Sequence, residues 1–360
     1  MKKRVFDGSV DYIQVMDENG NTDQELFPKD VDDQKIVQMY KLMSMARSLD
    51  AKALSLQRQG RAVTYAPTLG QEAEMIGSAM AMGKDDWFVP NFRQHPVFMV
   101  RGFPLDIGLL YWRGFEEGVL PKGFQSTAPC VPVATQMPHA AGLAFAFKYR
   151  KTGASVVGYV GDGGTSEGDF YEAINFAGVM KAPLVAIIEN NQWAISVPRS
   201  RQSAATTLAQ KAIAAGIPGV QVDGNDVIGV YKVVKDAQAN AQNGPTVIEV
   251  VTYRISMHTT ADDPTKYRNE ADVAYWQARD PIARVRTYIT KRGLWDDAKE
   301  KEMADGQLQA IDEAVEKAEK FKPDPKSMFE HIYSFMPQTL KDEYDTAVKA
   351  NYWQQQDASE

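Results

Sequence analysis

Short apolar runs alternate with longer segments of helical periodicity through most of the chain. The runs at residues 155–160 and 184–188 carry Val, Ile and Leu with little polar interruption, which is typical of strands buried on both faces of a sheet. Residues 87–90 and 245–252 form further β-rich runs, and helical stretches separate them. This alternation predicts an α/β fold with a doubly wound, mostly parallel sheet and helices on both faces.

The two ends of the chain depart from this alternation. Residues 1–31 are polar and rich in Asp and Asn, and we expect them to form an N-terminal arm. Residues 32–59 place apolar side chains at helical spacing, which predicts a long amphipathic helix. We therefore expect an α/β domain over 32–295 and a helical C-terminal extension over 296–360 that packs on the same domain.

Composition limits the kinds of partner. The 360 residues are 44% hydrophobic and 24% charged, as in a globular protein with a core, and the net charge of −7 argues against nucleic acid. Cys130 is the only cysteine, which excludes an internal disulfide and suits a reducing compartment. We find neither a signal peptide nor an apolar window that could span a bilayer, so we expect a cytoplasmic protein without a membrane partner.

Oxygen-bearing side chains follow two of the predicted strands. Asp162 comes just after the run at 155–160, and Asn191 lies just past the run at 184–188. A strand–helix–strand crossover would bring both to one edge of the sheet, where ligands bind in this architecture. Carboxylate and amide oxygens are hard ligands that suit Mg²⁺, so this edge is a candidate metal site.

The turn after the first of these strands is rich in glycine. Gly163 and Gly164 allow a sharp turn and a close approach to an anion. Thr165 or Ser166 is expected to cap the following helix, whose amino end attracts phosphate. An ordinary turn with a solvent-facing Asp is the alternative, but the Asn pair at 190–191 favours a ligand site.

Basic residues follow other predicted strands. Arg93 lies just after the run at 87–90, where a guanidinium can grip phosphate in a bidentate way, although a plain surface arginine is the alternative. Arg254 and His258 lie in a polar loop after the last β-rich run. His258 can bridge phosphate as an imidazolium or act as a neutral donor or acceptor, and a solvent-exposed loop histidine is the alternative.

Several motifs together carry a family resemblance. The 26 residues 164–189 separate Gly-Asp-Gly from Asn-Asn, and this spacing resembles the thiamine diphosphate motif. Further motifs occur in order: Gly-Gln-Glu-Ala at 70–73, the arginine at 93, Gly-Ile-Pro-Gly-Val-Gln-Val-Asp-Gly-Asn-Asp at 216–226 and Tyr-Arg-Ile-Ser-Met-His-Thr-Thr-Ala-Asp-Asp at 253–263. From about residue 32 the chain resembles the alpha subunits of the thiamine diphosphate-dependent first component of 2-oxo acid dehydrogenase complexes.

The resemblance implies the thiamine diphosphate-binding fold and a role for individual residues. Asp162, Asn191 and the backbone carbonyl of Trp193 would hold Mg²⁺. Gly163 and Gly164 would offer amides to the diphosphate, and His258 is the candidate catalytic residue. The implied cofactor-binding residues are Phe92, Arg93, Val133, Asp162, Gly163, Gly164, Asn191, Arg254 and His258.

Other positions carry finer implications. Val133 would present its backbone to the aminopyrimidine and its side chain to the substrate, and Phe92 stands where family members commonly carry Tyr, so one hydroxyl contact is missing. Thr135 and Gln136 match positions that hold K⁺ in branched-chain members. Thr259 aligns with a serine that is phosphorylated in mitochondrial relatives.

The activity that the resemblance implies needs a second chain. The thiazolium carbon of the cofactor would attack the ketone of a 2-oxo acid, CO₂ would leave, and the acyl group would pass to lipoamide. The glutamate that activates the cofactor comes from a beta subunit in two-chain members, and this sequence offers no candidate for it. We therefore expect an α₂β₂ heterotetramer that serves a lipoyl-bearing acyltransferase core.

Two other functions stay open on the sequence. An acetoin dehydrogenase alpha subunit shares the motif and differs in substrate, and a non-catalytic cofactor-binding assembly subunit is the alternative of another class. Among 2-oxo acids, residues 133–136 and 166–169 resemble branched-chain members slightly more than pyruvate members.

Overall fold

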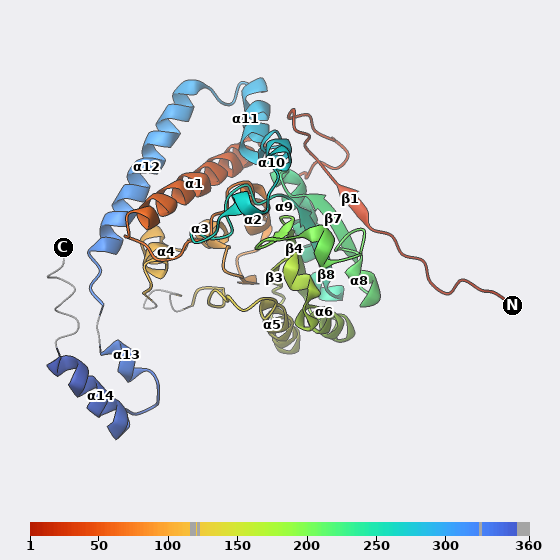
Figure 1. The fold of residues 1–360 in the computed structure, drawn as a ribbon. Coiled ribbons are helices and arrows are strands. Elements are labelled where there is room, and N and C mark those ends of the chain that lie inside the picture. The colour runs from red at the N-terminus through yellow and green to blue at the C-terminus, as the bar shows by residue number, and fades with distance from the viewer. Residues whose placement is uncertain (116–119, 121–122, 324–325, 351–360) are drawn as a thin grey trace. The chain divides into compact units, whose positions relative to one another are not determined.

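Six parallel strands form one sheet in the order β1-β7-β8-β4-β3-β2. The computed structural model in Figure 1 describes residues 1–115, 120, 123–323 and 326–350. The strands of this sheet are β1 (Asp11–Ile13), β2 (Trp87–Val89), β3 (Val156–Gly161), β4 (Leu184–Asn190), β7 (Gly219–Asp223) and β8 (Thr246–Val251). The short strands β5 (Trp193–Ala194) and β6 (Val197–Pro198) pair antiparallel beside it.

Helices connect the strands. The helices up to residue 319 are α1 (Asp33–Arg58), α2 (Glu72–Ala81), α3 (His95–Val100), α4 (Leu105–Trp112), α5 (Gln136–Arg150), α6 (Gly168–Met180), α7 (Arg199–Gln202), α8 (Lys211–Ala214), α9 (Val227–Asn240), α10 (Glu270–Gln277), α11 (Pro281–Lys291) and α12 (Asp297–Glu319). The long helix predicted at 32–59 is confirmed as α1, and Asp32 caps it by accepting from the Lys35 N–H at 2.8 Å. Within the described residues, no helix combines the length and the apolar character that a membrane crossing needs.

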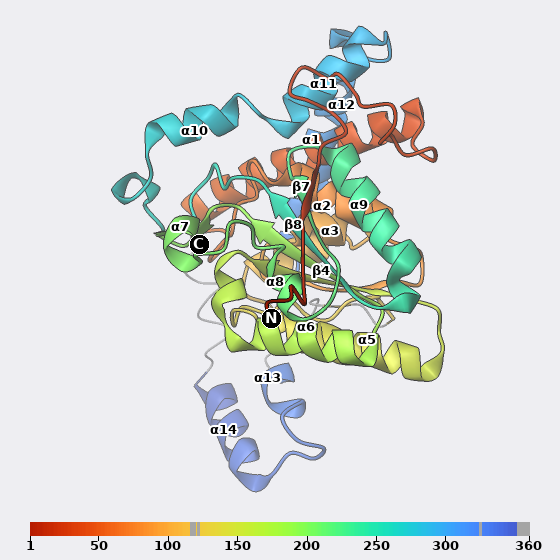
Figure 2. The ribbon, with the colours of Figure 1, turned by 90° about the vertical axis from the view of Figure 1, so that its right-hand side faces the viewer.

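Both faces of the sheet are covered. Successive side chains of a strand point to opposite faces, so Val157 and Ile187 pack into a cluster with α2 and α9, whereas Val156 and Ile188 pack with α5 and α6. Figure 2 shows these two helix pairs on opposite sides of the strands. The predicted doubly wound α/β fold is confirmed.

The N-terminal arm contains an edge strand that the sequence did not indicate. β1 pairs in parallel with β7, and the Asp226 carboxylate accepts from the N–H groups of Val15 at 2.6 Å and Met16 at 2.8 Å. Arg284 donates to the Met16 carbonyl at 2.8 Å and to Asp223 at 2.7 Å. Buried charged groups thus fix the arm to the domain.

The chain divides into two compact units, Met1–Val315 and Glu316–Glu360. The second contains α13 (Ser327–Glu330) and α14 (Gln338–Lys349), whose Phe329 and Tyr344 rings meet edge to face with centroids 5.5 Å apart. A domain boundary after residue 295 and packing of the extension on the domain stay predictions, and residues 351–360 lie outside the described residues.

Candidate active site

Four neighbouring parallel strands end at one edge of the sheet. Arg93, Asp162, Asn191 and Arg254 stand just beyond the carboxyl ends of β2, β3, β4 and β8. A pocket of about 550 Å³ opens at this edge. Of the predicted site residues, those that line it are Phe92, Arg93, Val133, Gln136, Asp162, Gly163, Gly164, Asn191, Trp193 and His258. Arg254 does not line the pocket itself, but it contacts His258, which does. Thr135 is not among the lining residues either.

The Asp162 carboxylate is a buried acid at the base of this pocket. It is 2% exposed, and its Oδ2 accepts from Gln202 Nε2 at 3.2 Å. Burial raises the pKa of Asp162 to about 6, although hydrogen bonds from Gly163 and Gln202 act in the other direction. A carboxylate so far from water needs a cation or a proton as its partner.

Asn191 and Trp193 supply further oxygen atoms. Asn191 Nδ2 donates to Gln71 Oε1 at 2.7 Å, which orients the amide, and the Trp193 carbonyl accepts from Arg254 Nη1 at 3.3 Å. Across the described ranges, no group of three or more His, Cys, Asp or Glu side chains has the arrangement of a metal site. A metal here would depend on one carboxylate, one amide oxygen and one backbone carbonyl, a hard set that suits Mg²⁺.

Two positions of the turn after β3 accept only glycine. A Cβ atom on Gly163 would lie 2.6 Å from the Ala194 Cβ, and one on Gly164 would lie 2.5 Å from Val160 Cγ2. Neither distance leaves room for a side chain, so the backbone itself forms this wall of the pocket. The observation is consistent with the predicted approach of an anion to these two residues.

The helix after this turn begins later than expected. Residues Gly163–Ser166 form a 3₁₀ turn, and α6 starts at Gly168 with Glu167 as its N-cap and no side-chain capping bond. The prediction that Thr165 or Ser166 caps the helix is therefore wrong. Thr165 Oγ1 donates at 2.8 Å to the Asp162 carbonyl instead, because the tight turn places its hydroxyl there.

Three residues in or next to the pocket wall have a strained backbone conformation. Ala134, Gln192 and Ile195 have φ angles of 66°, 73° and 54°, in the left-handed region that side chains rarely adopt. Ala134 and Ile195 line the pocket, and Gln192 separates Asn191 from Trp193. Such strain is concentrated at functional sites, where the surrounding structure enforces it.

Two buried arginines flank one histidine. Arg93 and Arg254 are 4% and 0% exposed, and their guanidinium groups lie 3.3 Å and 3.4 Å from His258 Nδ1. Burial, followed by the charge of Arg254, lowers the pKa of Arg93 to about 10. Among the described residues neither arginine forms an ion pair with a carboxylate, so the pair provides positive charge for an anion.

His258 is neutral near pH 7. Burial, followed by the charges of Arg93 and Arg254, lowers its pKa to about 4. Its Nδ1 faces two guanidinium donors and therefore accepts, which leaves the proton on Nε2. The geometry favours the neutral donor-or-acceptor alternative over the imidazolium. The alternative of a solvent-exposed loop histidine is wrong, because the ring is partly buried in the pocket wall.

Phe92 and Val133 lie on different parts of the wall. The Phe92 ring meets the His258 ring edge to face with centroids 5.6 Å apart, and Val133 is 57% exposed. Thr135 Oγ1 donates to the Pro132 carbonyl at 3.0 Å, and Gln136 Nε2 donates to the Cys130 carbonyl at 2.7 Å. A K⁺ site at Thr135 and Gln136 stays a prediction.

Three polar residues of the site were not identified from the sequence. Glu189 is buried, accepts from Asn91 at 2.5 Å and also from Gln94, and burial raises its pKa to about 7. Gln71 belongs to the Gly-Gln-Glu-Ala motif and Glu189 directly precedes the Asn pair at 190–191, so their positions could have indicated both. Gln202 follows no motif, and only the fold brings it to Asp162.

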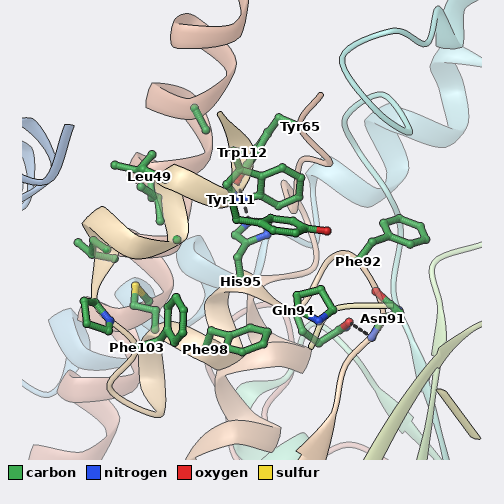
Figure 3. Close-up of a pocket in the computed structure, with 17 residues that line it drawn as sticks. Leu49, Tyr65, Asn91, Phe92, Gln94, His95, Phe98, Phe103, Tyr111 and Trp112 are labelled. Atoms are coloured by element: carbon green, nitrogen blue, oxygen red, sulfur yellow. Dashed lines mark hydrogen bonds between the residues drawn. The ribbon is translucent and has the colours of Figure 1, made fainter. Parts of the chain in front are cut away.

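A second, apolar pocket adjoins the first, and Asn91 and Phe92 line both. Figure 3 shows the rings of Tyr65 and His95 in its wall. His95 Nε2 lies 2.7 Å from Tyr65 Oη, which donates to Asp50 Oδ1 at 2.8 Å. Burial, followed by the charge of Arg93, lowers the pKa of His95 to about 3, so this ring is neutral too.

Comparison with known proteins shows the family of the chain. Residues 40–326 match the family model described as "Dehydrogenase E1 component". The chain therefore belongs to the dehydrogenase E1 component family, and its recognition as an alpha subunit of thiamine diphosphate-dependent 2-oxo acid dehydrogenases is confirmed.

Two relatives make the comparison more specific. The pyruvate dehydrogenase E1 component subunit alpha of Staphylococcus aureus is 44% identical over 338 residues, which cover 92% of this chain and 91% of the relative. The protein of the same name from Staphylococcus epidermidis is 43% identical over 338 residues, with the same coverage. This chain is thus similar to both over nearly its whole length.

Proposed function

We propose that the chain binds Mg²⁺ and thiamine diphosphate in the pocket at the strand ends and takes part in the oxidative decarboxylation of a 2-oxo acid. The observation that carries the proposal is a pocket lined by a buried carboxylate, Asp162, and a buried arginine, Arg93, with a second buried arginine, Arg254, against His258 of the pocket wall. A diphosphate chelated to Mg²⁺ has both charges that these groups require.

The residues divide into two sets. Asp162, Asn191 and the Trp193 carbonyl are hard oxygen donors and would hold the metal. Arg93, Arg254, His258 and the amides of the glycine turn would hold the diphosphate, and Val133 would contact the aminopyrimidine. When bound, the cofactor supplies the nucleophilic carbon that attacks the ketone.

His258 is the residue for which we propose a catalytic role. Its neutral ring can donate from Nε2 while Nδ1 accepts from the two guanidinium groups. The arginines thus orient the ring and hold its tautomer. Near pH 7 the ring can donate a hydrogen bond to an anionic oxygen without adding charge.

A partner subunit is the second part of the proposal. The sequence offers no glutamate to activate the cofactor, and Glu189 has its carboxylate engaged by Asn91 and Gln94. Val133 stands exposed at the pocket wall, where a second chain would have access. We propose a beta subunit in an α₂β₂ assembly, with acyl transfer to a lipoyl-bearing acyltransferase core.

The substrate that we propose first is pyruvate, because the relatives at 44% and 43% identity carry that name. Branched-chain 2-oxo acids, which residues 133–136 and 166–169 resemble slightly more, are the second candidate. Co-expression with the beta subunit and an assay of pyruvate, branched-chain 2-oxo acids and acetoin would separate both from the acetoin alternative. Binding of the cofactor without turnover of any of them would support the non-catalytic alternative.

The metal site has a direct test. Asp162→Ala should abolish binding of Mg²⁺ and thiamine diphosphate to the α/β complex in calorimetry, because the charged ligand is lost. Asp169→Ala, at an exposed position in the first turn of α6, is the matched control and should bind both as the wild type does. Unchanged affinity of Asp162→Ala would refute the assignment. For Thr135 and Gln136 we propose K⁺, which should raise the melting temperature more than Na⁺ does.

A further inference from the structure

A side chain from a separate segment holds the carboxylate of the proposed metal ligand. Gln202 is the last residue of α7, and its Nε2 donates to Asp162 Oδ2 at 3.2 Å and to the Val197 carbonyl at 3.0 Å. Asp162 and Gln202 are 40 residues apart in the sequence. The bond therefore adds a restraint from a second segment to a carboxylate that otherwise has a hydrogen bond from Gly163 of the turn after β3.

The other half of the same amide has no partner. Gln202 Oε1 is buried and accepts no hydrogen bond from the residues that the structure describes. It lies beside the glycine turn, 3.1 Å from where a Cβ on Gly163 would be, and Gln202 lines the pocket. Because buried amide oxygens are almost always hydrogen-bonded, this oxygen is available to a donor from a water or a ligand in the pocket.

We propose that Gln202 is a positioning residue of the metal site: its Nε2 holds Asp162 in place for the cation, and its Oε1 accepts from the hydration shell of that cation. The inference rests on the proposed function, since it takes Asp162 as a Mg²⁺ ligand. Mg²⁺ usually keeps several of its waters, and their O–H groups are the donors that Oε1 lacks. Outer partners of this kind change metal affinity by about 10- to 100-fold.

A purely structural role is the competing explanation. The bond from Gln202 to the Val197 carbonyl also holds the end of α7 near the β5–β6 pair. If that were its only role, any substitution that breaks the bond would weaken metal binding to the same extent. Positioning predicts that the chemistry of the substituted side chain decides the result.

Two variants separate these roles. Gln202→Met keeps the length but removes donor and acceptor, so Mg²⁺ affinity of the α/β complex with saturating thiamine diphosphate should fall about tenfold. Activity should return at high Mg²⁺, with kcat close to that of the wild type. Gln202→Glu also loses the Nε2 donor to Asp162 but keeps an oxygen acceptor and adds a negative charge beside the cation, so its loss of Mg²⁺ affinity should be clearly smaller than that of Gln202→Met.

The measurements are calorimetry with Mg²⁺ and water-proton relaxation with Mn²⁺, neither of which depends on turnover. Gln221→Met is the matched control: it removes another amide–carboxylate bond, from Gln221 Nε2 to Glu249 at 2.9 Å, at residues that do not line the pocket. Its metal affinity should not change. If Gln202→Met does not fold, Gln202→Asn replaces it, and a smaller loss of affinity is expected.

Three results would overturn the inference. They are wild-type affinity in Gln202→Met, an equal loss in the Met and Glu variants, and an equal loss in the Gln221 control. Asp162→Ala distinguishes this failure from that of the proposed function. If Asp162→Ala still binds Mg²⁺, the proposed function fails, whereas if it loses Mg²⁺ and the Gln202 variants behave as the wild type, only the inference about Gln202 fails.

Discussion

Replacing His95 by Phe should change how the stability of the protein depends on pH. Burial and the charge of Arg93 lower the pKa of His95 from 6.5 to about 3 in the folded protein. The folded state therefore disfavours the charged ring, which the unfolded chain forms freely below pH 6.5. The stability that this neutral ring gives is complete above pH 6.5 and is lost as the pH falls toward 3.

The size of the effect follows from proton linkage. At pH 5 the unfolded chain binds this proton almost completely and the folded chain binds almost none, which costs about 2 kcal/mol relative to pH 8. Any folded-state pKa well below 5 gives the same result. Against this, His95→Phe loses the hydrogen bond between Nε2 and Tyr65 Oη at 2.7 Å, which costs about 1 kcal/mol at every pH.

The two effects predict that the stability profiles cross. Thermal unfolding between pH 5 and pH 8, at a fixed concentration of the α/β complex, should find His95→Phe less stable than the wild type at pH 8 and more stable at pH 5. His139→Phe, at an exposed position on α5, is the control and should keep the wild-type slope. Parallel profiles of His95→Phe and the wild type would refute a buried neutral ring.

Three further predictions test other contacts. Gly163→Ala should abolish thiamine diphosphate binding in calorimetry, since the new Cβ would lie 2.6 Å from the Ala194 Cβ, and normal affinity would contradict this. Arg284→Met should lower the free energy of unfolding in urea by about 3–5 kcal/mol, because Asp223 loses its buried partner at 2.7 Å; a loss below 1 kcal/mol would contradict it. Phe92→Tyr should tighten cofactor binding severalfold in calorimetry through a new hydroxyl, and weaker binding would count against the missing-contact explanation.

The sequence was most informative where one strand determines the position of a residue. The apolar runs at 155–160 and 184–188 correspond to β3 and β4; β4 is buried along its whole length, and β3 is buried at every residue except Gly161. The position of a residue just after such a strand is largely determined by the sheet. The sequence alone could therefore predict that Asp162 and Asn191 lie at the same pocket.

Other features depend on contacts between distant segments. β1 has only three residues and no run of apolar positions, so its strand character arises from pairing with β7. Gln202 and His95 carry no local signal, because their environments are made by Asp162 and Tyr65 from other elements. Capping at Thr165 was mispredicted for a related reason: the 3₁₀ turn precedes the helix and uses that hydroxyl itself.

The pairing of β1 with β7 also constrains how the protein is made. Gln14 and Asp223, which hydrogen-bond at this pairing, are 209 residues apart. Synthesis proceeds from the N-terminus, so β1 leaves the ribosome long before its partner exists. Until β7 emerges, the N–H groups of Val15 and Met16 cannot reach the Asp226 carboxylate. The pairing of β1 with β7 is therefore a late step of folding. Until it occurs, the N-terminal arm can pair with other exposed strands.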